Sequence, residues 1–172
     1  VGGEAVVIPE GIQKEFQIVK LIDGYRNRGH LFTKTNPVRA RRKYAPTLEI
    51  ENFGLSKSDL STEFEAGSIL GIGKKTLQEI VNHLEAIYCD HIGIEYMYIR
   101  NPEEIAWIQN WLNKNDNHPS FSKEEKRHIL KKLNQTASFE GFLHSKYVGQ
   151  KRFSVEGLDA MIPGLDTLIE RG

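Results

Sequence analysis

Three helix starts are encoded in this sequence, and they constrain its fold more than any other feature. Thr76-Leu-Gln-Glu79 and Ser122-Lys-Glu-Glu125 are capping boxes, in which a hydroxyl and a glutamate three residues later satisfy free backbone N–H groups at a helix start. Asn101-Pro-Glu-Glu104 supplies an N-cap, a first-turn proline and an acidic first turn. Helices are therefore expected to begin close to residues 77, 102 and 123.

Apolar side chains recur at helical spacing after these starts and also near the amino terminus. The first stripe includes Ile12, Phe16, Val19 and Ile22, and Gly29 is a suitable helix stop. Further stripes follow Thr76 and lie within 102–112, and Ile129, Leu130 and Leu133 follow Ser122. We expect a shorter helix from Ser138, and a last helix that bears Leu158, Met161, Ile162, Leu165, Leu168 and Ile169.

Two stretches of the sequence do not follow a helical pattern. Residues 30–74 are interrupted by Pro37, Pro46, Gly54 and Gly71, which predicts a long connection with short helical turns. Residues 92–99 are rich in β-branched and aromatic side chains, so we expect an extended segment there. The predicted fold is mostly α, with capped amphipathic helices, long connections and one short extended segment. We divide it into an amino-terminal helix with its irregular connection (1–74) and a helical domain (75–172).

Composition limits the classes of partner. The chain has 23 Lys and Arg against 23 Asp and Glu, so no overall field attracts nucleic acid. No apolar run reaches the 18 or so residues needed to span a bilayer. We therefore expect neither a nucleic acid nor a membrane as partner. Because the chain lacks an initiator Met, we expect it to be a piece of a longer protein.

Few residues point to chemistry of their own. The six histidines show no metal-ligand spacing, so no metal site is predicted. Cys89, the single cysteine, follows a helix, and the negative end of the helix dipole disfavours a thiolate there. The basic run Arg39-Ala-Arg-Arg-Lys43 could hold a phosphate or an acidic partner, or form a solvated loop or an intersubunit ion-pair patch.

Several segments, in order, resemble a known enzyme family. They are Tyr25-Arg-Asn-Arg-Gly-His-Leu31, Cys89-Asp-His-Ile-Gly-Ile-Glu-Tyr-Met97, Lys146-Tyr-Val-Gly149 and Lys151-Arg-Phe-Ser-Val-Glu-Gly157. From about Phe16 to its end, the chain resembles the amino-terminal part of the decarboxylase component of the 2-oxoglutarate dehydrogenase complex. Tyr98 stands where this family commonly has His, and Leu158 stands where it usually has a small residue.

The resemblance implies a larger α/β oxidoreductase that uses thiamine diphosphate and Mg²⁺. Such an enzyme, oxoglutarate dehydrogenase (succinyl-transferring), decarboxylates 2-oxoglutarate in the tricarboxylic acid cycle and passes the succinyl group to a lipoyl group. The implied partners are the lipoyl-bearing succinyltransferase of a multienzyme complex and a second copy of the parent protein. The implied location is the bacterial cytoplasm or, in a eukaryote, the mitochondrial matrix.

The resemblance also limits what this chain contributes. The family's Gly-Asp-Gly motif is missing, and the lone Asp23-Gly24 lies within a predicted helix. We therefore expect no catalytic residue here, no bound cofactor and no activity of the isolated chain. Arg152, Phe153 and Glu156 are expected in an active-site wall; alternatively, Phe153 plugs a core while Arg152 and Glu156 form an ion pair. A non-catalytic helical interaction module is the alternative function.

Overall fold

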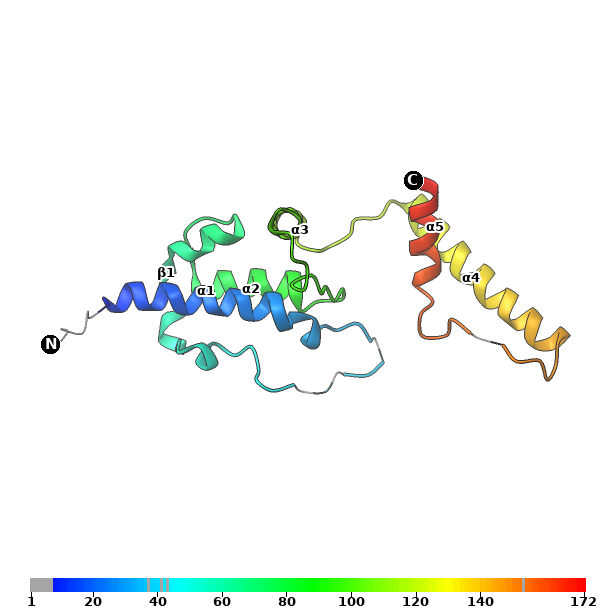
Figure 1. Cartoon of the computed structure of the whole chain (residues 1–172), viewed down its shortest axis with the longest axis horizontal. Helices are drawn as coiled ribbons and strands as arrows, with labels where there is room; N and C mark the ends of the chain where they lie inside the picture. Colours follow the sequence, from blue (N-terminus) through cyan, green and yellow to red (C-terminus); the bar gives the residue numbers. More distant parts are fainter. Residues whose placement is uncertain (1–7, 37, 41, 43, 153) are drawn as a thin grey trace. The chain divides into compact units, whose positions relative to one another are not determined.

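The computed structural model describes residues 8–36, 38–40, 42, 44–152 and 154–172, and this part of the chain is mostly helical, as expected. It forms two compact units, one that ends at Pro119 and one that comprises Ser120–Gly172. The α-helices are α1 (Glu10–Arg28), α2 (Leu77–Tyr88), α3 (Pro102–Asn115), α4 (Lys123–Lys146) and α5 (Met161–Arg171) (Figure 1).

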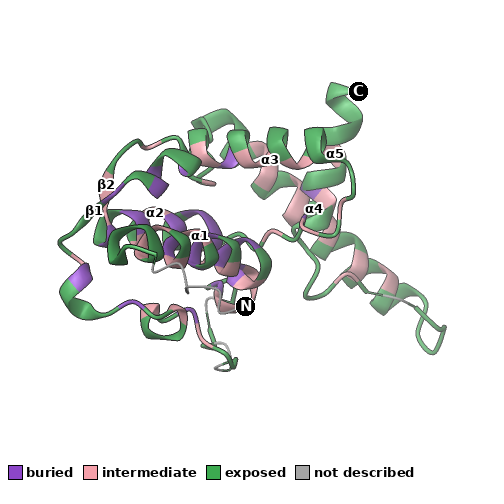
Figure 2. Cartoon of the chain, turned by 60° about the vertical axis from the view of Figure 1, so that its left-hand side comes forward, coloured by how far each residue is buried: buried purple, intermediate pink, exposed green. Residues whose placement is uncertain are grey.

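The core of the first unit lies between α1 and α2, which run side by side (Figure 1). Their facing sides are buried (Figure 2). Ile18 and Leu21 of α1 and Leu77, Ile80 and Leu84 of α2 have no exposed surface. The expected division between residues 74 and 75 falls inside this unit, because helices from both sides of it share one core.

Gly29 ends α1, as predicted, and it does so where α1 meets the end of α2. A Cβ atom added at Gly29 would lie 2.5 Å from the Cβ of Tyr88. The Tyr88 hydroxyl shares a buried hydrogen bond of 3.0 Å with the hydroxyl of Tyr96. The segment around Tyr96, residues 92–96, is neither helix nor strand, so the expected extended stretch forms no β-ladder.

The connection from residue 30 to residue 74 contains short helical turns, as predicted. They are the 3₁₀ turns η1 (Gly29–Phe32), η2 (Ile50–Phe53), η3 (Lys57–Asp59) and η4 (Glu65–Leu70). A feature that we did not predict is the antiparallel pair β1 (Glu63–Phe64) and β2 (Lys75–Thr76), in which Glu63 pairs with Thr76. This pair brings the end of the connection to the start of α2.

All three predicted helix starts are confirmed. At α2, the Thr76 hydroxyl accepts a hydrogen bond from the Glu79 backbone N–H, and the Glu79 carboxylate accepts one from the Thr76 N–H at 3.0 Å. Ser122 and Glu125 make the same reciprocal cap at α4. At α3, the Asn101 side chain accepts from the Glu103 N–H.

The second unit is a pair of helices, α4 and α5, joined by residues 147–160. The prediction of a separate helix from Ser138 was wrong, because α4 runs unbroken from Lys123 to Lys146. Thr136, two residues before Ser138, donates its hydroxyl to the Lys132 carbonyl, which shows how a polar side chain can bond within the helix rather than cap a new one. Pro163 lies in the first turn of α5, where backbone N–H groups have no acceptor within the helix, so the N–H that proline lacks costs no hydrogen bond. This preference of proline for the first turn explains the late start of α5.

No helix in the described ranges is both long and apolar enough to cross a membrane.

Candidate functional site

The connection between α4 and α5 carries the predicted wall residues Arg152 and Glu156, and Glu140 anchors this connection to α4. The Glu140 carboxylate on α4 accepts a hydrogen bond from the Val155 backbone N–H and another from the Ser154 hydroxyl, both of 2.9 Å. The Ser154 hydroxyl oxygen in turn accepts from the Glu156 N–H at 3.0 Å. Residues 154–156 are thus anchored to α4 by a side chain that the sequence analysis did not single out.

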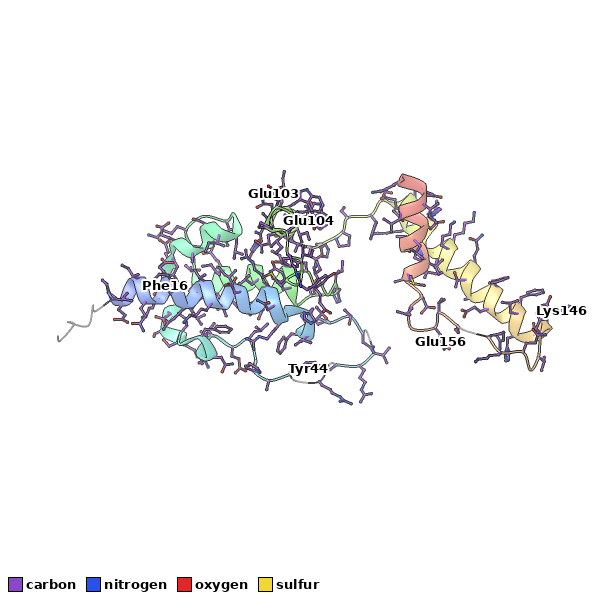
Figure 3. All side chains as sticks on the ribbon, in the orientation of Figure 1. Phe16, Tyr44, Glu103, Glu104, Lys146 and Glu156 are labelled. Carbon is purple, nitrogen blue, oxygen red and sulfur yellow. The ribbon has the colours of Figure 1, made fainter. Side chains whose placement is uncertain are left out.

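Two of the three predicted wall residues can be placed. The guanidinium of Arg152 is 2.5 Å from the Nδ1 of His144, and both side chains are exposed. Glu156 is exposed near the other end of the connection (Figure 3). Phe153 lies outside the described residues. Within the described residues Arg152 and Glu156 form no ion pair with each other, so the structure does not support the ion-pair alternative.

α5 packs on α4 but leaves most of its large apolar side chains exposed. Its least exposed side chains are Ile162, Pro163 and Asp166. Four of its large apolar side chains are 45% to 81% exposed. We call this set the apolar face of α5, and it comprises Met161, Leu165, Leu168 and Ile169.

The second unit has almost no core of its own. α4 has no buried residue over 24 positions, and Pro163 is the one buried residue of α5. Phe139 and Phe142 on α4 are also more than half exposed. Amphipathic helices normally turn their apolar stripe toward the protein interior, and an exposed stripe of this kind marks a surface for another polypeptide.

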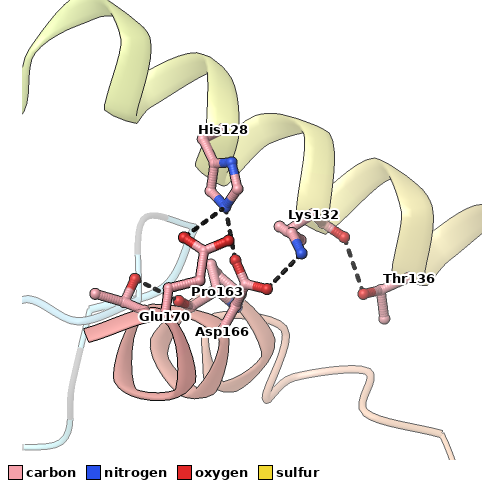
Figure 4. A network of polar contacts seen from close by, with 7 residues as sticks. His128, Lys132, Thr136, Pro163, Asp166 and Glu170 are labelled. Carbon is pink, nitrogen blue, oxygen red and sulfur yellow. Dashed lines mark hydrogen bonds and ion pairs between the residues drawn. The ribbon is translucent and has the colours of Figure 1, made fainter. Parts of the chain in front are cut away.

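A polar cluster holds α5 to α4 (Figure 4). The Nε2 of His128 lies 2.6 Å from one oxygen of Asp166, and the Lys132 ammonium hydrogen-bonds to the other. Glu170 lies 4.0 Å from His128. The hydrogen bond from Lys132, followed by the one from His128, keeps the pKa of the Asp166 carboxyl below its usual range. The sequence analysis missed this cluster because its two halves are more than 30 residues apart.

The first unit has a cavity of about 1070 Å³ beneath the long connection. Its lining includes Arg39 and Arg42 of the basic run, and also Glu49, Glu51 and Glu85. Arg41 and Lys43 lie outside the described residues. The lining therefore carries both signs of charge rather than a uniformly positive surface.

Cys89 borders this cavity but is not suited to act as a nucleophile. It is the C-cap of α2 and packs partly buried against the core. Burial, with a contribution from Glu85, raises the pKa of the thiol to about 12. The thiolate is therefore scarce at neutral pH, as the sequence analysis predicted.

The described residues do not fit a thiamine diphosphate and Mg²⁺ site. In the described part of the chain, His128, Asp166 and Glu170 are the one group of side chains that could hold a metal ion. Mg²⁺ prefers oxygen ligands in octahedral geometry, whereas this group offers an imidazole nitrogen and a carboxylate that is already bonded to Lys132.

Comparison with known proteins found no matching family model but several similar curated proteins. The multifunctional 2-oxoglutarate metabolism enzyme of Mycolicibacterium vanbaalenii is 40% identical over 95% of this chain. The 2-oxoglutarate dehydrogenase E1/E2 component of Corynebacterium glutamicum is 39% identical over 93% of it. The 2-oxoglutarate dehydrogenase E1 component of Coxiella burnetii is 40% identical over 88% of it.

The chain spans 13% to 16% of the length of these relatives. The ordered motifs from Tyr25 to Gly157 had indicated the same family. Over nearly its whole length, this chain matches one segment of these relatives, and it belongs to the 2-oxoglutarate dehydrogenase E1 family.

Proposed function

We propose that this chain is the amino-terminal part of an E1 component that decarboxylates 2-oxoglutarate and transfers the succinyl group to a lipoyl group on the succinyltransferase of its complex. The identity of 39% to 40% to proteins with these names is the observation that supports the reaction. In the whole enzyme, thiamine diphosphate with Mg²⁺ supplies the decarboxylation chemistry. The residues that hold this cofactor lie outside the present chain, and the whole enzyme works as a homodimer in the cytoplasm.

The role that we propose for the segment itself is that of a scaffold that docks on the rest of the enzyme. The apolar face of α5 carries this proposal, because its four side chains are 45% to 81% exposed. Covering a Leu, Ile or Met side chain completely contributes about 1.5–3 kcal/mol. A pair of helices without a core depends on such a contribution, since isolated helices are marginally stable in water.

The connection fastened by Glu140 gives the segment its proposed link to catalysis. Arg152 and Glu156 are exposed, and residues 154–156 are anchored to α4. We propose that, when the apolar face of α5 is covered, this connection lies against the cofactor domain and forms part of the active-site wall with Phe153. Positioning by a rigid helix suits this role, because groups at an active site need precise placement.

The test uses the whole enzyme and measures the 2-oxoglutarate-dependent reduction of ferricyanide. Replacing both Leu165 and Leu168 of the apolar face by Ser should lower the activity at least tenfold. The matched control is Val38→Ser, because Val38 is also apolar and is 92% exposed but lies in the first unit. Full activity of the double variant would overturn the docking proposal, whereas a parent protein inactive on 2-oxoglutarate would overturn the proposed reaction.

The exposed apolar face also favours the second candidate, a non-catalytic helical interaction module. The two candidates differ in the length of the native protein, because the enzyme needs a reading frame several times longer than this chain. We also propose that the isolated chain neither binds thiamine diphosphate nor decarboxylates 2-oxoglutarate. Titration calorimetry that detects tight, magnesium-dependent binding of the cofactor to it would contradict this expectation.

A further inference from the structure

The polar cluster between α4 and α5 brings together three side chains that bind metals in many proteins. His128 comes from α4, and Asp166 and Glu170 lie one turn apart on α5 (Figure 4). One donor atom from each of the three lies within 4.8 Å of the other two. An imidazole combined with two carboxylates is a donor set that suits Zn²⁺ and related divalent transition metals.

The distances are close to those that a metal ion requires. With bonds of about 2.0–2.2 Å, the donors around a tetrahedral Zn²⁺ are separated by about 3.3–3.5 Å. The distance from His128 to Asp166 is 2.6 Å and would have to open, and that from His128 to Glu170 is 4.0 Å and would have to close. Each of these two changes is smaller than about 1 Å. The donor oxygens of Asp166 and Glu170 lie within 4.8 Å of each other and would also have to approach, and side-chain torsions can absorb shifts of this size.

The charges around the three donors are compatible with an added cation. Lys132 bonds one oxygen of Asp166 and leaves the oxygen that faces His128 available to a metal. Such an outer partner is common around metal sites, where it orients the ligating carboxylate. Glu170 is 60% exposed on its side chain, and it adds a second negative charge beside the imidazole.

We propose that His128, Asp166 and Glu170 form a binding site for a divalent transition-metal ion, with Zn²⁺ as the best match, that joins α5 to α4. The inference does not depend on the proposed catalytic function. Its structural value follows from the missing core of the second unit, because a ligand that binds only the folded state stabilises that state. The ion would hold α5 to α4 through Asp166 and Glu170, while Leu168 and Ile169 stay largely exposed.

The test is a titration of the 172-residue chain with Zn²⁺, followed by calorimetry. We expect binding of a single ion that a chelator reverses. Co²⁺ in the same site should give the visible absorption of a tetrahedral ion with nitrogen and oxygen ligands. Circular dichroism before and after addition checks that every variant is folded.

Glu170→Gln is the decisive variant, because its one described contact in the cluster is the 4.0 Å approach to His128. It removes a metal ligand but leaves Asp166 bonded to both His128 and Lys132. We expect Glu170→Gln and His128→Ala each to weaken Zn²⁺ binding at least about tenfold, since changes to residues behind the ligands alone commonly cost 10–100-fold.

The matched controls are Glu103→Gln, an exposed acid of α3, and His118→Ala, an exposed histidine before α4. Both should bind Zn²⁺ as the unaltered chain does. The proposal is overturned if Zn²⁺ produces no binding heat in the unaltered chain. It is also overturned if Glu170→Gln and His128→Ala bind Zn²⁺ as tightly as the two controls, because the ion would then bind elsewhere.

Discussion

Replacing Gly29 by Ala tests the account of the first unit most sharply. Gly29 has a helical backbone, with φ −55° and ψ −38°, so an alanine suffers no strain from its torsion angles. The obstacle is packing, because the added Cβ would lie 2.5 Å from the Cβ of Tyr88 and 3.1 Å from its carbonyl oxygen. Tyr88 is 1% exposed, so neither backbone can retreat without disturbing the core.

The expected magnitude combines two opposing effects. Adding a methyl group to a packed core costs about 1–3 kcal/mol. Gly→Ala also restricts the unfolded chain, which stabilises the folded state by about 0.4–1 kcal/mol. We therefore expect Gly29→Ala to lower the free energy of unfolding of the first unit by about 1–2 kcal/mol. With a urea dependence of about 2 kcal/mol/M, the midpoint should fall by about 0.5–1 M.

Tryptophan fluorescence during urea titration reports the unfolding of the first unit. The chain has two tryptophans, Trp107 and Trp111, and both lie on α3 in the first unit. Gly11→Ala is the matched control, since a Cβ at Gly11 in α1 would meet nothing within 4 Å. The control should be unchanged or slightly more stable. A Gly29→Ala protein as stable as Gly11→Ala would refute the packing argument.

Four further predictions concern single side chains. Thr76→Ala removes the N-cap of α2 and should destabilise the first unit by about 1 kcal/mol, measured by the same urea titration. Hydrogen bonds from Lys75 and Thr76 lower the pKa of Glu79 to about 2 from 4.5. The Glu79 carboxylate therefore adds stability to the first unit above pH 4.5, and this stability is lost as the pH falls toward 2. In the Glu79→Gln variant, the urea midpoint should fall less between pH 4.5 and pH 2 than in the unaltered chain. Cys89, with its thiol pKa raised to about 12, should react slowly with a thiol reagent in the folded chain and quickly in urea; equal rates would contradict its burial. Glu140→Gln weakens two bonds to the connection between α4 and α5, so trypsin should cut residues 147–160 faster than in the unaltered chain.

Local signals in the sequence predicted several helix ends well. The capping boxes at Thr76 and Ser122 and the stop at Gly29 depend on atoms a few residues apart, so spacing alone reveals them. The β1–β2 pair was not predicted, because two residues per strand leave no alternating pattern to detect. The break expected at Ser138 was wrong, because a Ser or Thr residue marks a possible helix start but does not require one, and α4 continues through it.

The candidate site depended on information that the sequence does not contain locally. The motif around Arg152 marked the connection, but Glu140, which fastens it, was visible only once α4 and the connection were placed together. His128 and Asp166 likewise meet only because α5 folds back on α4. The stripe of Met161, Leu165 and Leu168 predicted a helix correctly, and the structure leaves these three side chains 45% to 69% exposed.

Hydrogen–deuterium exchange of the backbone amides of α4 and α5 tests the docking claim most directly. It compares the 172-residue chain with the whole enzyme, both in the presence of a chelator so that no metal ion contributes. We predict that α4 and α5 exchange quickly in the isolated chain and slowly in the whole enzyme, while α1 and α2 are equally protected in both. Equal protection of α4 and α5 in the two proteins would contradict the account, because no other polypeptide would then be covering the apolar face of α5.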